Sequence, residues 1–188
     1  MKKKPAALRE LKKLSAIPFT DENYRAIVDS LKSESDRSMV VIAGSILEDE
    51  LQSRIQRTLI QLDKEDSQRF FGFDGLAGTF SSKILMAYSL GLIDSHTRYL
   101  LDIVREVRNA CAHSRMPVNF DTPELKNATV LLLPESLRKK SNRDQLRAQF
   151  LTVTSMLLTI IARGKSESEE AKVRSIIDRV FSRANTGS

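Results

Sequence analysis

Residues 37–62 carry the pattern that most limits how this chain can fold. Apolar or small residues recur there every three or four positions: Val40, Gly44, Leu47, Leu51, Ile55, Leu59 and Leu62. An α-helix turns once in about 3.6 residues, so this spacing places all seven on one wide face. A helix with so broad an apolar face must be covered by other elements of the chain.

Those other elements are also predicted to be helices. Thr20 caps a helix from Asp21, and further helices are predicted over 81–90, from 94 or 95 to 113, from Thr122-Pro123 to Pro134, over 141–164 and over 166–184. A glycine-rich turn precedes residue 81, and the run at 130–133 is ambiguous between helix and strand. Elsewhere no segment shows the alternation of a strand. We predict an all-α fold, a single compact bundle of six to eight helices over residues 20–184, preceded by a basic arm over 1–19.

Composition limits the expected cellular location of the chain and the metals or cofactors it could hold. The single cysteine, Cys111, cannot form an internal disulfide, and no apolar core follows the basic N-terminus, so we expect a cytoplasmic protein. The longest apolar run, 150–162, is shorter than the roughly 20 residues needed to span a bilayer, so we expect no membrane contact. The two histidines, His96 and His113, lack partners at metal-binding spacing. We predict no metal and no cofactor.

Positive charge is concentrated near the N-terminus. The chain carries +6, and its first 20 residues hold six basic residues against Glu10 alone. A second basic stretch follows at 138–147, where Glu135 and Asp144 dilute it. Candidate nucleic-acid contacts are Lys2, Lys3, Lys4, Lys12, Lys13, Arg138, Lys139 and Lys140. A solvated, partly disordered tail is the preferred interpretation of the first cluster, so we expect weak, salt-sensitive contact at most.

A hairpin around Ala87 and Gly91 has the spacing of a helix-turn-helix. Its second helix, however, is rich in leucine, isoleucine and valine on a wide face, whereas a DNA-reading helix must present polar side chains to base edges. We predict a core helix at 94–113.

Arg108 and His113 are the candidate catalytic pair. A histidine could take the 2′-hydroxyl proton of RNA while an arginine stabilises the anionic transition state, with Asn109 orienting either group. Five helical positions, however, separate two side chains by about 140° around the axis. The pair could therefore meet only if the helix unwinds or if two chains combine their residues. The alternative is structural: Arg108 pairs with a carboxylate from Glu48, Asp49 or Glu50, and His113 stabilises the end of its helix.

The run GLAGTFSSKILMAYSLGLIDSHTRYLLDIVREVRNACAHS, with VVIAGSILEDELQSRI before it and Phe120 after it, resembles the core of the mannitol operon repressor (MltR) family. The likeness covers about residues 35–125. It implies a compact all-helical regulator of sugar-operon transcription without an evident DNA-binding motif, which favours repression through a protein partner.

The ending Arg108-Asn109-x-x-x-His113 is also similar to the signature of HEPN ribonuclease domains. Those domains are helical and usually dimeric, and they place two such motifs across the dimer interface. The resemblance implies roles for Arg108, Asn109 and His113, with Glu48 as a supporting acid. Many domains of this kind serve as interaction modules, so it supports the fold more than the activity.

We therefore predict a homodimeric regulator of the mannitol-repressor type that acts mainly as a protein-interaction module with a partner still to be identified. The alternative is a metal-independent endoribonuclease that uses Arg108 and His113 across a dimer interface. A third hypothesis is direct DNA binding through residues 1–13 and 138–147, which predicts affinity that falls steeply with salt.

Overall fold

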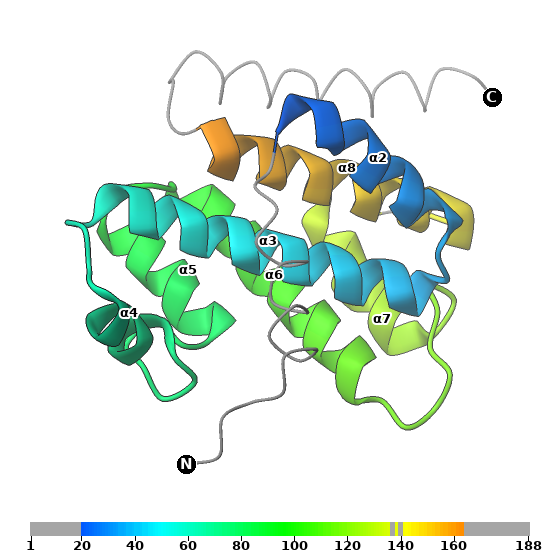
Figure 1. Ribbon diagram of the computed structural model, residues 1–188. Coiled ribbons are helices and arrows are strands. Elements are labelled where there is room, and N and C mark those ends of the chain that lie inside the picture. The colour runs from blue at the N-terminus through cyan, green and yellow to red at the C-terminus, as the bar shows by residue number, and fades with distance from the viewer. Residues whose placement is uncertain (1–19, 136–137, 139–140, 164–188) are drawn as a thin grey trace, which may run out of the picture.

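A computed structural model describes residues 20–135, 138 and 141–163 of the 188-residue chain (Figure 1). Its regular elements are α2 (Asp21–Ser33), α3 (Asp36–Thr58), α4 (Lys64–Phe71), α5 (Phe80–Ser89), α6 (Ser95–His113), α7 (Pro123–Thr129), a short 3-10 turn η2 (Val130–Leu132) and α8 (Arg143–Arg163). Every regular element in this part of the chain is helical, which confirms the predicted all-α bundle.

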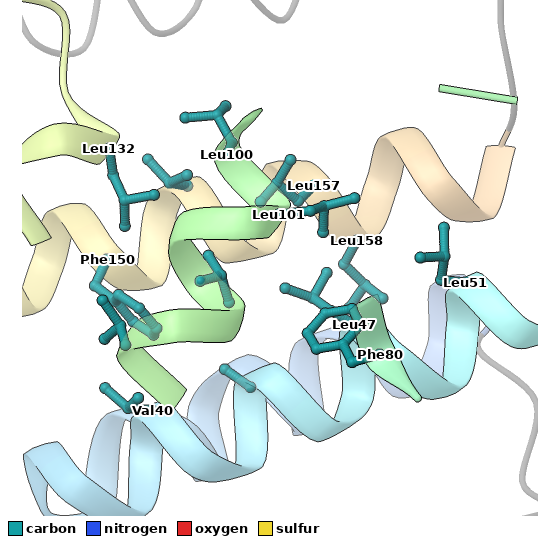
Figure 2. Close-up of a cluster of buried hydrophobic side chains, with 14 of the residues drawn as sticks. Val40, Leu47, Leu51, Phe80, Leu100, Leu101, Leu132, Phe150, Leu157 and Leu158 are labelled. Atoms are coloured by element: carbon teal, nitrogen blue, oxygen red, sulfur yellow. The ribbon is translucent and has the colours of Figure 1, made fainter. Parts of the chain in front are cut away.

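Helix α3 is the centre of the bundle. It packs against α8, α6 and α5, while α2 contacts both α3 and α8. In Figure 1, α2 and α8 lie on one side of α3, and α5, α6 and α7 lie on the other. The residues that the periodicity places on its apolar face are buried from Val40 to Ile55. Figure 2 shows leucines of α3, α6 and α8 meeting Phe80 of α5 and Phe150 of α8 in this core.

Local capping explains where most helices begin. Thr20 and Asn23 exchange side-chain bonds with each other's backbone N–H at the start of α2, and Thr79 and Ser82 do the same at the start of α5. Asp94 accepts from the Thr97 N–H at the start of α6. Gly91 ends the α5 hairpin with φ of +68°, a backbone conformation that glycine adopts without strain. The α5–α6 connection thus follows from sequence, and α6 buries its apolar stripe in the core as predicted.

The predicted helix over 37–62 is too long. Helix α3 ends at Thr58 because Leu59 has an extended backbone. Asp63 then caps α4 by accepting from the Asp66 N–H. Helix α4 has no counterpart among the helices expected from sequence. The first three residues of the ambiguous run at 130–133 form the 3-10 turn η2 and not a strand.

Helix α8 begins at Arg143, two residues after the predicted start, where Asn142 and Gln145 bond each other's backbone N–H. By length and composition alone, α8 is long and apolar enough to cross a membrane. Its uninterrupted apolar run, 150–162, is shorter than the roughly 20 residues that a membrane span needs. Phe150 and Leu157 are buried in the core around α3, and this packing accounts for the apolar composition. The predicted helix over 166–184 and the basic arm over 1–19 lie outside the described residues.

Candidate functional site

Three helices meet at one carboxylate. Lys83 Nζ of α5 lies 2.8 Å from Glu48 Oε1 of α3, and Arg108 Nη2 of α6 lies 3.4 Å from Glu48 Oε2. The side chains are 6% exposed for Lys83, 16% for Glu48 and 27% for Arg108. An ammonium this deeply buried requires a charged partner, and Glu48 supplies it. The cluster therefore ties α3, α5 and α6 together at one point.

Arg108 reaches Glu48 because α3 has no side chain in its path. A Cβ added to Gly44 would lie 2.7 Å from Arg108 Cγ and 3.0 Å from its Cβ, too close for undisturbed packing. Gly44 therefore lets the aliphatic part of Arg108 lie directly against the α3 backbone. The same guanidinium donates from Nη1 to Asn109 Oδ1 at 3.0 Å. Its buried Nε has no hydrogen-bond partner within the described part of the chain.

Asp49 adds a second carboxylate beside this cluster. Loss of water around Asp49 raises its pKa, the neighbouring Glu48 carboxylate raises it further, and Lys83 opposes the shift. Glu50 faces away from the cluster and instead accepts from Arg57 at 2.9 Å. Of the three consecutive acids, Glu48 is the one that Arg108 contacts, which confirms the structural pairing considered from sequence.

His113 lies apart from this cluster. It is the last residue of α6 and its side chain is exposed, whereas Arg108 points to Glu48 on the neighbouring helix. Helix α6 continues without unwinding through both residues, so the separation of about 140° around the axis applies. Within one chain the structure brings together Arg108, Asn109 and Glu48, but not His113.

The end of α6 is held by a residue that sequence reasoning missed. Arg37 Nη2 donates to the carbonyl of Ser114 at 3.0 Å and to that of Ala112 at 3.4 Å. A cation at a helix C-terminus stabilises the carbonyls that no helical N–H can reach. Arg37 thus holds the end of α6 alongside His113, which is the basic residue of the last turn as the structural interpretation expected. Because Arg37 is far away in sequence, no signal pointed to its contact.

A second buried carboxylate, Asp36, was also missed. Its side chain is fully buried, accepts from Arg143 Nε at 2.8 Å and from the Phe120 N–H at 3.2 Å, and pairs with Arg147. Burial favours the neutral acid, but the bonds from Arg143, Phe120 and Arg147 together hold the pKa of Asp36 below its usual value.

Arg147 also donates to the carbonyls of Leu31, Lys32 and Glu34 at the end of α2. Two of the five cations in the basic stretch at 138–147, Arg143 and Arg147, are therefore used to join α8 to the α2–α3 junction.

The nucleic-acid candidates are placed only in part. Arg138 donates from Nε to the Leu133 carbonyl at 3.1 Å and is half-buried. The other candidates, Lys2, Lys3, Lys4, Lys12, Lys13, Lys139 and Lys140, lie outside the described residues. Their contact with nucleic acid remains a prediction.

Cys111 is a core residue in this fold. It is fully buried, and burial raises the pKa of its thiol to about 11. A thiol with so little thiolate is a poor nucleophile at neutral pH. Across residues 20–135, 138 and 141–163 there is no group of three or more His, Cys, Asp or Glu side chains that could hold a metal ion.

No protein-family model and no curated protein matches the chain. Among solved structures, the chain is similar to one chain of the "X-ray structure of the MtlR-HPr complex from Escherichia coli", with a TM-score of 0.61 and 15% sequence identity. The similarity covers 76% of this chain and 99% of that chain. At this identity the comparison shows an MtlR-like fold, in agreement with the resemblance stated from sequence.

Proposed function

We propose that this chain is a cytoplasmic, homodimeric regulator of transcription that acts by binding another protein. The MtlR-like fold supports a regulatory role, and the similar solved structure is a complex of MtlR with a second protein, HPr. In this proposal Arg108, Asn109 and Glu48 are scaffold residues, because their contacts lie between helices of the same bundle.

The observation that carries this proposal is the ion pair of Arg108. A guanidinium that stabilises a phosphoryl transition state must be free to contact it. Here Glu48 and Asn109 already engage its two terminal nitrogens, and the histidine that would act as the base lies on another side of α6. Lys83 shares Glu48, so breaking this arrangement would disturb three helices.

A metal-independent endoribonuclease is the second candidate. The observation that favours it is that Arg108, Asn109 and Glu48, three of the four residues implied by the HEPN resemblance, form one partly exposed cluster. In this case the base would be His113 of a second copy, because His113 of the same chain does not face the cluster.

The deciding experiment has two readouts on the same variants. Purified protein is incubated with several RNAs in EDTA, and the ends are examined for a 2′,3′-cyclic phosphate. In parallel, transcripts are compared between a strain lacking the protein and strains that express wild type or His113→Ala. His96→Ala is the matched control, because His96 is also exposed on α6 but lies in its first turn.

If the chain is a regulator, no variant cleaves RNA and His113→Ala fully restores the transcript profile. The enzyme predicts cleavage by wild type and His96→Ala, no cleavage by His113→Ala, and failure of that variant to restore transcripts. Transcripts that do not differ between the deletion strain and the wild type would contradict a role in transcription.

A further inference from the structure

Within the described residues, an apolar surface lies open to solvent at the end of the bundle formed by α4, α5 and the end of α3. A groove of about 380 Å³ is lined by Leu59, Phe70, Leu76, Leu85, Met86 and Leu90, with two serines of α5. Three of these side chains are largely open to solvent: Leu76 is 72% exposed, Leu85 53% and Leu90 42%. Apolar groups this exposed are expected to be covered by another molecule.

The surface continues past Leu59. That residue also lines a second hollow, of about 190 Å³, together with Ile60, Leu62 and Phe71. Ile60 is 83% exposed, and Phe73 on the following loop is 88% exposed. We name the two hollows and Phe73 the α4–α5 surface.

The charge of this region suits contact with an identical copy. Residues 56–90 hold four basic and four acidic residues. Because Lys83 is buried against Glu48, the charges open to solvent are three basic and four acidic and nearly balance, whereas the whole chain carries +6. In a two-fold contact the same patch meets itself, and a patch with net charge would repel its copy. An apolar patch whose surrounding charges of both signs nearly balance avoids most of this repulsion.

The size of the surface is near the lower limit for a specific dimer. If a fully exposed large side chain presents roughly 150 Å², the lower end of the aromatic range, the exposed side chains of the α4–α5 surface present on the order of 500 Å² per copy. Two copies would then bury about 1,000 Å² together, close to the minimum for a specific interface.

We infer that the occupant of the α4–α5 surface is the same surface of a second copy of this chain, related by a two-fold axis. The inference rests on the homodimer in the proposed function and adds the interface. It also separates the dimer contact from His113. Arg37 at the start of α3 contacts the end of α6, and Leu59 follows its last residue, so the two regions lie about 33 Å apart along α3. Such a dimer keeps the two His113 side chains apart.

Sedimentation equilibrium of the full chain from about 1 to 300 μM tests the inference. The variants are Leu85→Glu on α5 and Leu76→Glu on the preceding loop, both at exposed positions, so the fold should tolerate them. The matched control is Met116→Glu, because Met116 is 70% exposed but lies beyond the His113 end of α6. Far-UV circular dichroism verifies that each variant is folded.

The inference predicts a wild-type dimer, a dissociation constant raised at least about 100-fold by either α4–α5 variant because each buries two unpaired carboxylates, and no change for Met116→Glu. A wild-type dimer that both α4–α5 variants leave unchanged, or that Met116→Glu dissociates instead, overturns the interface but not the homodimer. A wild type that is monomeric at every concentration overturns both.

Discussion

The contact between Gly44 and Arg108 gives the sharpest test of how α3 and α6 are held together. In a solvent-facing helix, replacing glycine with alanine stabilises by about 1 kcal/mol, because alanine restricts the unfolded chain and favours the helix. At Gly44 the new Cβ would lie 2.7 Å from Arg108 Cγ and 3.0 Å from Arg108 Cβ. Both atoms are close to the α6 backbone, so the two helices must separate to relieve the overlap.

The magnitude follows from these opposing effects. Overpacking a tight contact costs roughly 1–3 kcal/mol, and moving α6 would also lengthen the 3.4 Å contact between Arg108 and Glu48. The cost should therefore lie at the upper end of that range, about 3 kcal/mol. After subtraction of the propensity gain, Gly44→Ala should lower the free energy of unfolding by about 2 kcal/mol.

Urea unfolding followed by far-UV circular dichroism measures this change, since the chain has no tryptophan to report by fluorescence. A double-mutant cycle with Arg108→Ala isolates the contact, because alanine removes Cγ and leaves only the contact at 3.0 Å. In that background the cost of Gly44→Ala should shrink by at least about 1 kcal/mol. The reasoning is refuted if Gly44→Ala stabilises the wild type, or if its cost is the same in both backgrounds.

Three further predictions concern single groups. Thr79→Ala removes the acceptor for the Ser82 N–H at 3.1 Å and should cost about 1 kcal/mol in urea unfolding; an unchanged midpoint would contradict the cap. The pKa of Asp36 is lowered from 3.8 in the folded state, so its ionised form contributes stability that is complete above pH 3.8 and is lost as the pH falls through the lower folded value. The thermal unfolding temperature should therefore fall more steeply between pH 5 and pH 2 for wild type than for Asp36→Asn. Parallel dependences of the two unfolding temperatures on pH would contradict the lowered pKa of Asp36. Burial raises the pKa of Cys111 from 9.0 to about 11. At pH 8 the thiol of native protein should therefore react with iodoacetamide at least roughly 100-fold more slowly than the thiol of protein in urea, as mass spectrometry can measure. Similar rates would show that the thiol is accessible.

The starts of helices were predictable where a capping side chain is followed by an apolar stripe. Thr20, Thr79 and Asp94 combine a capping side chain with an apolar stripe behind it, and each begins a helix close to the predicted residue. Helix α4 has the cap, Asp63, but only eight residues and no buried side chain. Its sequence, KEDSQRFF, therefore resembles a polar connection. The apolar spacing of α3 continues to Leu62, across the break at Leu59.

The candidate site was predictable only as a set of alternatives. Sequence placed a carboxylate of residues 48–50 opposite Arg108 but could not select Glu48, because the choice depends on how α3 rotates against α6. Lys83 carries a signal that points to a buried acid. It is the one charged residue in FSSKILMAYS, and a lysine on the inward side of such a helix requires a buried acid.

The basic residues at 138–147 show why a run of positive charge is a poor guide to nucleic-acid binding. Residues 138–147 have five cations on a short stretch, which is the pattern expected of a phosphate-binding surface. Yet Arg143 and Arg147 bond to Asp36, more than 100 residues earlier in the chain, and Arg138 bonds to the Leu133 carbonyl. The sequence gives no sign that Asp36 is their partner, since it looks like an ordinary acid in the first turn of α3.

An arginine that neutralises a buried carboxylate cannot move to a phosphate without leaving that carboxylate unpaired. The contacts of Arg143 and Arg147 with Asp36 therefore reduce the number of cations on this stretch that are available to bind phosphate. Direct nucleic-acid contact would then depend on Lys139, Lys140 and the N-terminal lysines, which predicts that substituting Arg143 lowers stability while leaving the salt dependence of any binding unchanged.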